Sequence, residues 1–377
     1  MGASGGASSG SFTCGGAAGT VYVLNGTSSY LIFDNSEGTS ASSTLTPFPP
    51  DLNGVLLSQL NISGKAYVDL RQSKQNNDVR ASVLNLDQNS KITGDSVVID
   101  TSNATIRGQI LATAAVWLHN AQSGPGRVTA FSGSSITCTS GTLKMSLAGS
   151  TVALHGSISA TNAEIKGLRS FSHTGTLIAS GSYLSIMVET ATIRGVVRCT
   201  GAACSSLVSV NETLELGGSL SCTNDKCALS VRSGGDMTAT GTISCSGNGE
   251  IRTQGKISVL GTIRCISALC PLELEGGQIE VGKIGNIQGG DVIMKSEKIT
   301  VQGSISTTGQ GYAEEEGSGK GSRPLAIYSS HSSWRVAGSG AGHGGAGADA
   351  CYSLSSSYGS KPSGTLGLYV SMPVHVE

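Results

Sequence analysis

Six of the ten cysteines in this 377-residue chain fall into three pairs that share one spacing. The pairs are Cys199 with Cys204, Cys222 with Cys227, and Cys265 with Cys270. Cys245 follows a repeated glycine by four residues, as the first cysteine of each pair does, but Glu250 stands in place of its partner. A zinc knuckle needs two residues between its cysteines, and histidines are missing nearby. The spacing therefore predicts small disulfide-closed loops in an oxidising compartment, and the alternative is reduced thiols stacked in the core.

Four asparagines lie in the Asn-x-Ser/Thr acceptor sequence for N-glycosylation. These glycosylation candidates are Asn25, Asn61, Asn103 and Asn211. Chance supplies one or two such triplets in a chain rich in serine and threonine, so they add support to the cysteine argument. We expect an extracellular or cell-surface protein that passes through the secretory pathway.

Residues capable of hydrolytic chemistry are dispersed. Gly342-His343-Gly344 resembles the Gly-His-Gly segment of polygalacturonases, which also need clustered aspartates for acid and base work. Aspartate is absent from residues 101 to 224, and the aspartates of the repeat region are scattered along it: Asp95, Asp100, Asp225, Asp236 and Asp291. The histidines show no metal-ligand spacing. We therefore expect no catalytic, cofactor-binding or metal-binding residues and no cofactor.

A lyase would need calcium-binding carboxylates beside a basic residue. Arg194, Arg198 and Arg264 are spaced to form a surface stripe, but carboxylates do not accompany them in a repeated place. The Gly-Gly-Asp triplets that end at Asp236 and Asp291 are isolated. Calcium-binding nonapeptides work as uninterrupted arrays, so we expect these two triplets to be turns.

These residues lie on a repeat of Gly, any residue, then Ile, Leu or Val. Its glycines are 19 to 25 residues apart, at Gly108, Gly133 (with one residue inserted), Gly156, Gly175, Gly195, Gly218, Gly241, Gly261, Gly282 and Gly303. Short runs between them alternate apolar and polar residues, which is the period of a strand with one buried face. The Leu-x-x-Leu-x-Leu frame of leucine-rich repeats is absent. The repeat predicts an all-β, right-handed, single-stranded parallel β-helix (solenoid) of about ten or more coils of 19–25 residues.

Equivalent side chains of successive coils should stack in such a fold. The residue two positions after each repeat glycine is apolar and predicts an interior ladder: Ile158, Leu177, Val197, Leu220, Ile243, Ile263, Ile284 and Ile305. We expect each repeat glycine to occupy a corner where a positive φ is needed.

Composition excludes several classes of protein. Charged residues make up 13% of the chain and the formal charge is −1, so no basic field attracts nucleic acid. A run of eighteen apolar residues is missing, so we expect no membrane span within this chain. The start lacks a signal peptide and the end looks cut, which predicts a piece of a longer protein.

The repeat divides the chain into three regions. Residues 1–90 are weakly periodic and form an N-terminal cap or irregular β coils, residues 91–310 form the parallel β-helix, and residues 311–377 form a Gly/Ser-rich loop with a C-terminal coil fragment.

Two glycine-rich segments carry a resemblance. One runs from Cys14 through Tyr22, and the other from Gly338 through Gly347, followed by Cys351 and Pro362. With the coils between them they resemble an uncharacterised family of very large, glycine-rich, β-helical proteins of plants and protists. The resemblance covers nearly the whole chain and implies a secreted or membrane-anchored protein with a pectin-lyase-like architecture.

We therefore expect a non-enzymatic extracellular structural or adhesive module that binds cell-surface or wall glycans or other proteins. The alternative is a polysaccharide-degrading enzyme, a pectinase-like hydrolase or lyase, on the same fold. A third interpretation is an adhesin or autotransporter-type passenger, although such passengers usually carry few cysteines.

Overall fold

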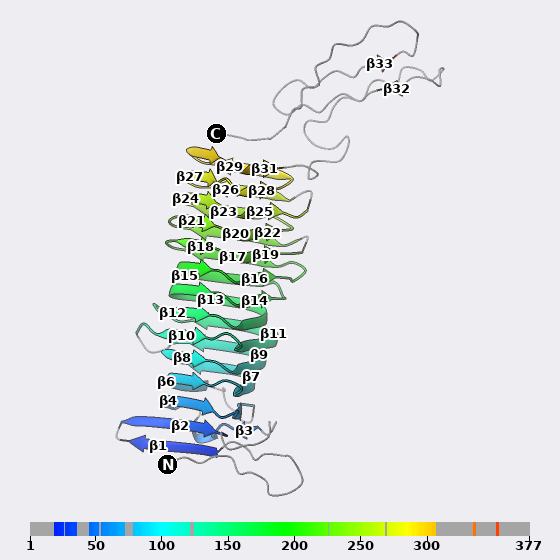
Figure 1. Ribbon diagram of the computed structural model, residues 1–377. Coiled ribbons are helices and arrows are strands. Elements are labelled where there is room, and N and C mark those ends of the chain that lie inside the picture. Colours follow the sequence, from blue (N-terminus) through cyan, green and yellow to red (C-terminus); the bar gives the residue numbers. More distant parts are fainter. Residues whose placement is uncertain are drawn as a thin grey trace.

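The computed structural model describes residues 19–25, 27–35, 45–52, 54–71, 78–120, 124–224, 226–267 and 270–306, together with two short strands at 335–336 and 352–353. The chain winds into an all-β solenoid of about 11 turns, with parallel strands stacked from coil to coil (Figure 1). This confirms the predicted parallel β-solenoid, whose right-handed winding stays a prediction. The second glycine-rich segment, with His343 and Cys351, lies outside the described residues, and so does the first segment up to residue 18, including Cys14.

Each coil contributes strands to three parallel ladders, which we call faces A, B and C. Face A holds the strands that follow the repeat glycines. Its members are β3 (Thr46–Pro47), β5 (Tyr67–Asp69), the first parts of β7 (Lys91–Asp100), β9 (Gln109–His119), β11 (Ser135–Ser146) and β13 (Ser157–His173), then β14 (Thr176–Ala179), β16 (Val196–Cys199), β19 (Ser219–Cys222), β22 (Thr242–Cys245), β25 (Thr262–Cys265), β28 (Asn286–Gln288) and β31 (Ser304–Ser306).

Face B comes next along each coil, and face C closes the circuit. Face B contains the start of β6 (Asp78–Leu86), the later parts of β7, β9 and β11, the middle of β13, the start of β15 (Tyr183–Ile193), β17 (Ser205–Val210), β20 (Ala228–Ser233), β23 (Gly249–Thr253), β26 (Pro271–Glu275) and β29 (Asp291–Lys295). Face C contains β2 (Ser28–Asp34), β4 (Leu56–Ser63), the end of β6, β8 (Asn103–Ile106), β10 (Arg127–Ala130), β12 (Thr151–Leu154), the ends of β13 and β15, β18 (Leu214–Leu216), β21 (Met237–Ala239), β24 (Lys256–Val259), β27 (Gln278–Val281) and β30 (Lys298–Val301).

An antiparallel hairpin lies at the N-terminal end of the solenoid. β1 (Gly19–Asn25) pairs antiparallel with β2, which in turn pairs parallel with β4. A single 3-10 turn, η1 (Pro50–Leu52), follows β3. Further along the chain, β32 (Arg335–Val336) and β33 (Tyr352–Ser353) form a separate two-stranded antiparallel sheet.

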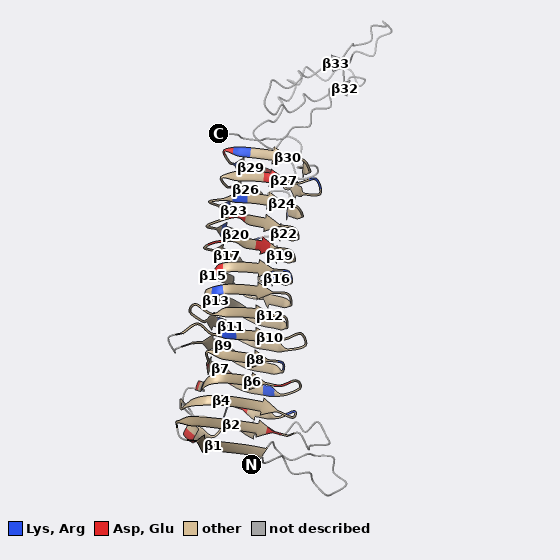
Figure 2. Ribbon diagram, turned by 60° about the vertical axis from the view of Figure 1, so that its left-hand side comes forward, with Lys and Arg blue, Asp and Glu red and all other residues tan. Residues whose placement is uncertain are grey.

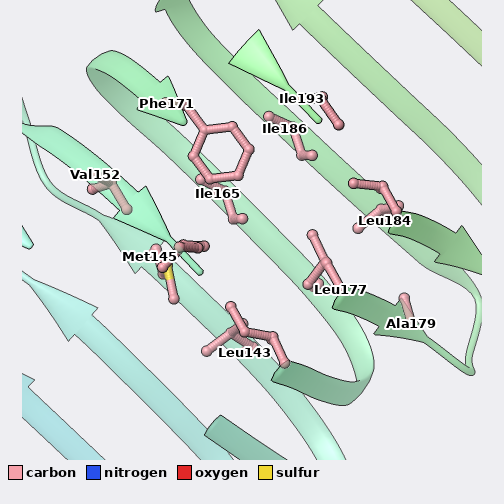
Figure 3. Packing of buried hydrophobic residues seen from close by; sticks show 14 of the residues in the cluster. Leu143, Met145, Val152, Ile165, Phe171, Leu177, Ala179, Leu184, Ile186 and Ile193 are labelled. Carbon is pink, nitrogen blue, oxygen red and sulfur yellow. The ribbon is translucent and has the colours of Figure 1, made fainter. Parts of the chain in front are cut away.

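Alternation places one side of most strands of the solenoid in a continuous apolar core. Leu220 pairs in register with Ile243, and Ile243 with Ile263, so this part of the predicted ladder exists and these three side chains are almost fully buried. Figure 3 shows side chains from faces A, B and C meeting in this interior, with Leu177 opposite Ile165 and Phe171. Burial of such apolar surface contributes about 25 cal/mol per Å² to stability, so each coil is stabilised by the coils beside it.

One predicted rung of the ladder is wrong. Ile284 is 81% exposed, and Ile287 pairs with Ile263 instead. Residues 282–285 form an added turn closed by the Gly285 amide, which donates to the Gly282 carbonyl. Gly285 therefore takes the place that the spacing assigned to Gly282, and the inward position moves three residues along the chain.

The predicted reason for the repeat glycines is wrong for nine of the ten. The stacked glycines at 195, 218 and 241 do not have positive φ angles. A Cβ on Gly218 would lie 2.0 Å from the carbonyl oxygen of Gly195, and one on Gly241 would lie 1.9 Å from that of Gly218. These positions exclude every larger residue because the backbones of successive coils approach too closely for a side chain. Gly133 is the one repeat glycine with a positive φ, and other glycines with positive φ, such as Gly149, lie outside the repeat.

The ladders cross residue 90 without interruption. β6 pairs with β7 through residues 78–80 and with β8 through residues 83–86, and β5 pairs with β7 on face A. The division of the chain into domains at 90 and 310 stays a prediction. Within the described part of the chain, helices of the length and hydropathy required for a membrane crossing are absent.

Candidate functional site

The cysteines line one interior corner of the solenoid. Cys199, Cys222, Cys245 and Cys265 occupy the same register position at the end of face A in four successive coils. The sulfur atoms of the three predicted pairs, Cys199 with Cys204, Cys222 with Cys227 and Cys265 with Cys270, lie at disulfide-bonding distance. We call the four stacked cysteines and their three partners the sulfur column, and all seven are buried.

Cys245 has no disulfide partner, for a reason that differs from the sequence interpretation. Glu250 lies on the outer side of face B, in register with Ser230 and Glu273. Gly249 pairs with Leu229 and Leu272, so Gly247 occupies the place that Cys227 and Cys270 hold in the neighbouring coils. The turn after Cys245 is shorter and does not carry a second cysteine. Burial raises the pKa of the Cys245 thiol to about 11.

The four glycosylation candidates all lie on strands or at their ends. Asn25, Asn103 and Asn211 are exposed. Asn61 is half-buried, and its Oδ1 accepts hydrogen bonds of 2.8 Å from the side-chain amides of Gln59 and Asn85. Asn61 therefore takes part in a coil-to-coil amide contact on face C. Attachment of glycans at these positions stays a prediction.

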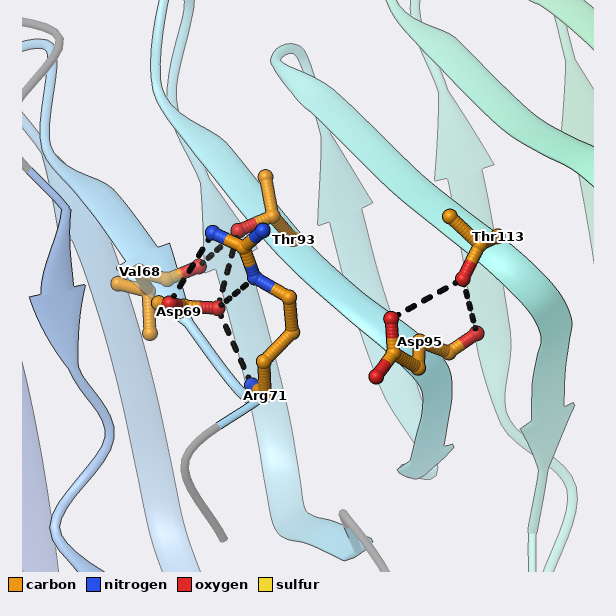
Figure 4. Close-up of polar contacts among 6 residues, drawn as sticks. All are labelled: Val68, Asp69, Arg71, Thr93, Asp95 and Thr113. Carbon is orange, nitrogen blue, oxygen red and sulfur yellow. Dashed lines mark hydrogen bonds and ion pairs between the residues drawn. The ribbon is translucent and has the colours of Figure 1, made fainter.

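Several aspartates contact residues of a neighbouring coil. Asp69, which is 5% exposed, lies between Arg71 and Thr93, and the Arg71 Nε lies 2.9 Å from Asp69 Oδ1 (Figure 4). Burial alone would raise the pKa of Asp69, but the hydrogen bonds and charge of Arg71 outweigh it and hold that pKa below its usual value. Asp95 accepts a 3.1 Å hydrogen bond from the Thr113 hydroxyl one coil further on.

Asp100 and Asp236 also have local partners. Asp100 pairs with the Nε of Arg80 at 3.1 Å. Asp236 accepts a 2.8 Å hydrogen bond from the Lys256 amide. Asp291 is exposed at the start of β29, and Asp225 lies outside the described residues.

The proposed arginine stripe is interrupted. Arg198 and Arg264 share one register position on face A but are separated by Ser221 and Ser244 in the coils between them. Arg194 lies 4.0 Å from Glu215 in an exposed ion pair. Figure 2 shows charged residues distributed thinly over the coils rather than gathered at one place.

A carboxylate cluster on face B was missed in the sequence. Glu250, Glu273 and Glu275 converge on the guanidinium of Arg252, which lies 3.5 Å from Glu273 and 3.3 Å from Glu275 and also contacts Glu250. Lys295 lies 3.4 Å from Glu273. Glu273 and Glu275 alternate with inward leucines in β26, so period two places them outward, but only coil stacking brings Glu250 beside them.

An exposed aromatic side chain on face B was missed as well. Trp117 is 44% exposed and lies between Val98 and Lys144 of the adjacent coils. The Lys144 Nζ lies 5.3 Å from the centre of the Trp117 ring, close enough for a cation–π contact. Glu164 follows Lys144 in the next coil. Alternation with buried Val116 and Leu118 already directs Trp117 outward, and this signal was present in the sequence.

Comparisons of the chain with protein-family models, with curated proteins and with solved structures find no match. The fold defines the class of the protein, a β-solenoid with cysteine pairs at disulfide distance. The resemblance to the large glycine-rich proteins of plants and protists stays a prediction.

Proposed function

We propose that the chain is a non-enzymatic module of an extracellular or cell-surface protein and that it binds glycans on face B. The observation that carries this proposal is the exposed ring of Trp117 on a parallel sheet. Tryptophan combines a large apolar surface with a polar N–H group. Such rings are enriched at binding interfaces where one end of the side chain contacts apolar groups and the other end is hydrated. A sugar ring presents a matching apolar face edged by hydroxyl groups.

The surroundings of Trp117 suit a polar ligand. Lys144 holds a cation beside the ring, and Glu164 in the next coil adds an acceptor. Glu164 also forms an ion pair with Lys166, whose Nζ lies 2.8 Å from Glu164 Oε1. Trp117, Lys144 and Glu164 therefore form a strip across three successive coils. The strip offers an apolar ring, then a donor and an acceptor, at the coil spacing of about 4.8 Å, and this arrangement suits an extended saccharide.

The cellular location is supported by two independent features. Cysteine pairs at disulfide distance favour an oxidising compartment. The acceptor asparagines at 25, 103 and 211 are exposed, as an oligosaccharide chain requires. An adhesin or passenger role shares the same binding prediction.

A glycan array tests the proposal. Wild-type protein should bind a defined set of saccharides, and Trp117→Ala should reduce that binding at least tenfold. Met187→Ala is the matched control, because Met187 is 38% exposed on the same face but lies outside the Trp117 column. Binding that survives Trp117→Ala unchanged, or an array without any bound saccharide, would count against glycan recognition at this site.

The alternative of a polysaccharide-degrading enzyme has one observation in its favour, the convergence of Glu250, Glu273 and Glu275. Retaining glycosidases hold two carboxyl groups about 5 Å apart. Incubation with pectic and other wall polysaccharides, followed by measurement of released reducing ends, tests this alternative. Activity that is present in the wild type and lost in Glu273→Gln would replace the binding proposal with the enzymatic one.

A further inference from the structure

The sulfur column contains a three-sulfur cluster. The Cys245 Sγ lies 3.6 Å from the Sγ of Cys265 and 3.6 Å from the Sγ of Cys270. Cys245 and Cys265 stack in adjacent coils, and Cys270 returns to the same point from the corner that follows Cys265. Each is at most 3% exposed. The three sulfur atoms all lie within 4.8 Å of one another. Among the described residues, no other group of three Cys, His, Asp or Glu side chains brings its donor atoms this close together.

The geometry argues against simple exchange of the Cys265–Cys270 bond with Cys245. Thiol–disulfide exchange begins when a thiolate attacks one sulfur from behind, in line with the bond that breaks. Such an attacker lies close to one sulfur and far from the other, whereas Cys245 is equally distant from both. Burial also favours the protonated thiol of Cys245, which is a poor nucleophile. The cluster therefore suits a shared ligand better than a sulfur relay.

We propose that Cys245, Cys265 and Cys270 form a buried three-sulfur site for Cu(I) once the Cys265–Cys270 bond is reduced. Sulfur is a soft donor, and thiolates favour Cu(I), zinc and iron–sulfur clusters over harder cations. Structural zinc sites are almost always closed by four ligands, so three sulfurs leave a tetrahedral zinc ion one ligand short.

The chemistry balances with a named reductant. A water-soluble phosphine cleaves the disulfide, and with one water molecule it gives two thiols and the phosphine oxide. Each thiol that then binds Cu(I) releases its proton to solvent, because the thiolate is the ligand. The single positive charge of Cu(I) offsets part of the cost of the buried thiolate charge, which favours ionisation of a cysteine that binds it.

The neighbouring pairs provide an internal comparison. After reduction, Cys199 with Cys204 and Cys222 with Cys227 also become dithiols, but the third sulfur is specific to the Cys245 coil. Tighter binding by three sulfurs than by two therefore separates this site from the others. The site exists only in the reduced chain, before the disulfides form in the oxidising compartment of the proposed function, and it is independent of glycan binding on face B.

The experiment uses the full chain, reduced with the phosphine under anaerobic conditions and titrated with Cu(I) against a chromophoric Cu(I) chelator. Cys245→Ser should lower the affinity of the first Cu(I) at least tenfold. Cys138→Ser is the matched control, since Cys138 is another buried thiol, with its register neighbour Ala160 in the next coil, and its affinity should equal that of the wild type. Equal affinities in wild type and Cys245→Ser would overturn the proposal.

A second measurement does not depend on a variant that folds. X-ray absorption at the copper edge of the wild-type protein with one equivalent of Cu(I) should give three sulfur ligands. Two sulfur ligands would place the metal at a dithiol pair and overturn the three-sulfur site. Unreduced protein should retain no copper at this site, and equal retention before and after reduction would also overturn it.

Discussion

The corner between faces A and B is built in two ways along the solenoid. In the first stretch, residues 91–193, two to four residues separate the last inward residue of face A from the first inward residue of face B. The pairs that bound this corner are Gly94 and Val97, Ala112 and Val116, Cys138 and Leu143, Ala160 and Ala163, and Ala179 and Leu184. Here strands such as β13, with 17 residues, run through the corner without a break.

In the second stretch, residues 196–275, the corner lengthens and cysteines close it. Six residues separate Cys199 from Ser206, and the same number separates Cys222 from Leu229 and Cys265 from Leu272. Each of these long corners carries a cysteine pair at disulfide distance. A longer loop has more conformational freedom to lose on folding, and a cross-link removes part of that freedom from the unfolded chain.

The coil of Cys245 is an informative exception within the second stretch. Only three residues separate Cys245 from Gly249, and the second cysteine is missing. Bridges therefore accompany long corners rather than a region of the chain. The shortened corner leaves one sulfur without a disulfide partner beside the bridge of the next coil, which creates the three-sulfur cluster.

The largest expected effect tests what the two stretches share, namely the interior ladder. Ile110→Asp in the first stretch and Ile243→Asp in the second should each lower the free energy of unfolding by more than about 4 kcal/mol, because an unpaired charge replaces a buried side chain. Thermal unfolding followed by circular dichroism measures the loss. Thr242→Asp is the control, since Thr242 lies on the outer side of the same strand. Unchanged melting of Ile243→Asp would contradict the ladder.

A smaller effect should be confined to the second stretch. Replacing Cys222 and Cys227 together by serine should lower the free energy of unfolding by about 2 kcal/mol, the value expected for a short cross-linked loop. Calorimetry with and without reductant measures it, and reductant should lower the melting temperature of the wild type more than that of the double variant. Cys138→Ser provides the control for loss of a buried thiol without a bridge. A double variant that melts like the wild type would remove the distinction between the two kinds of corner.

The smallest effect is a pH dependence located in the first stretch. His173 is buried in the core, stacked on Phe171, and burial lowers its pKa below the usual 6.5. As the pH falls below 6.5, the unfolded chain takes up the proton first, so the neutral buried histidine destabilises the fold by at most about 1.4 kcal/mol per pH unit. His173→Leu should abolish this loss. Melting temperatures between pH 7 and pH 5 measure it, and parallel curves for wild type and variant would contradict the assignment.

Much of this architecture was readable from the residues. Period two placed Leu220, Ile243 and Ile263 inward, and the glycine spacing gave the coil length. The spacing of Cys199 and Cys204 gave the pairing because both cysteines flank one corner. Local patterns of this kind are repeated in successive coils, so an irregular residue in one coil does not change the fold that the other coils predict.

The candidate surface sites were less accessible to prediction. Trp117 is directed outward by its strand, but its neighbours Val98 and Lys144 are 19 and 27 residues away in the chain and meet it only through the register of the coils. The register itself depends on the length of each corner. Ile284 was misplaced because an added turn of three residues shifted the inward position to Ile287.

The sequence by itself determined that the chain is a β-solenoid and which cysteines pair, because alternation and spacing act within a single coil. The tertiary structure shows why the repeat glycines are required. It also determines which sulfur atoms, carboxylates and aromatic rings lie in contact with residues of a neighbouring coil. Those outcomes depend on contact between successive coils: a carbonyl that leaves no room for a Cβ at Gly241, and a shortened corner that brings Cys245 against the bridge of the next turn.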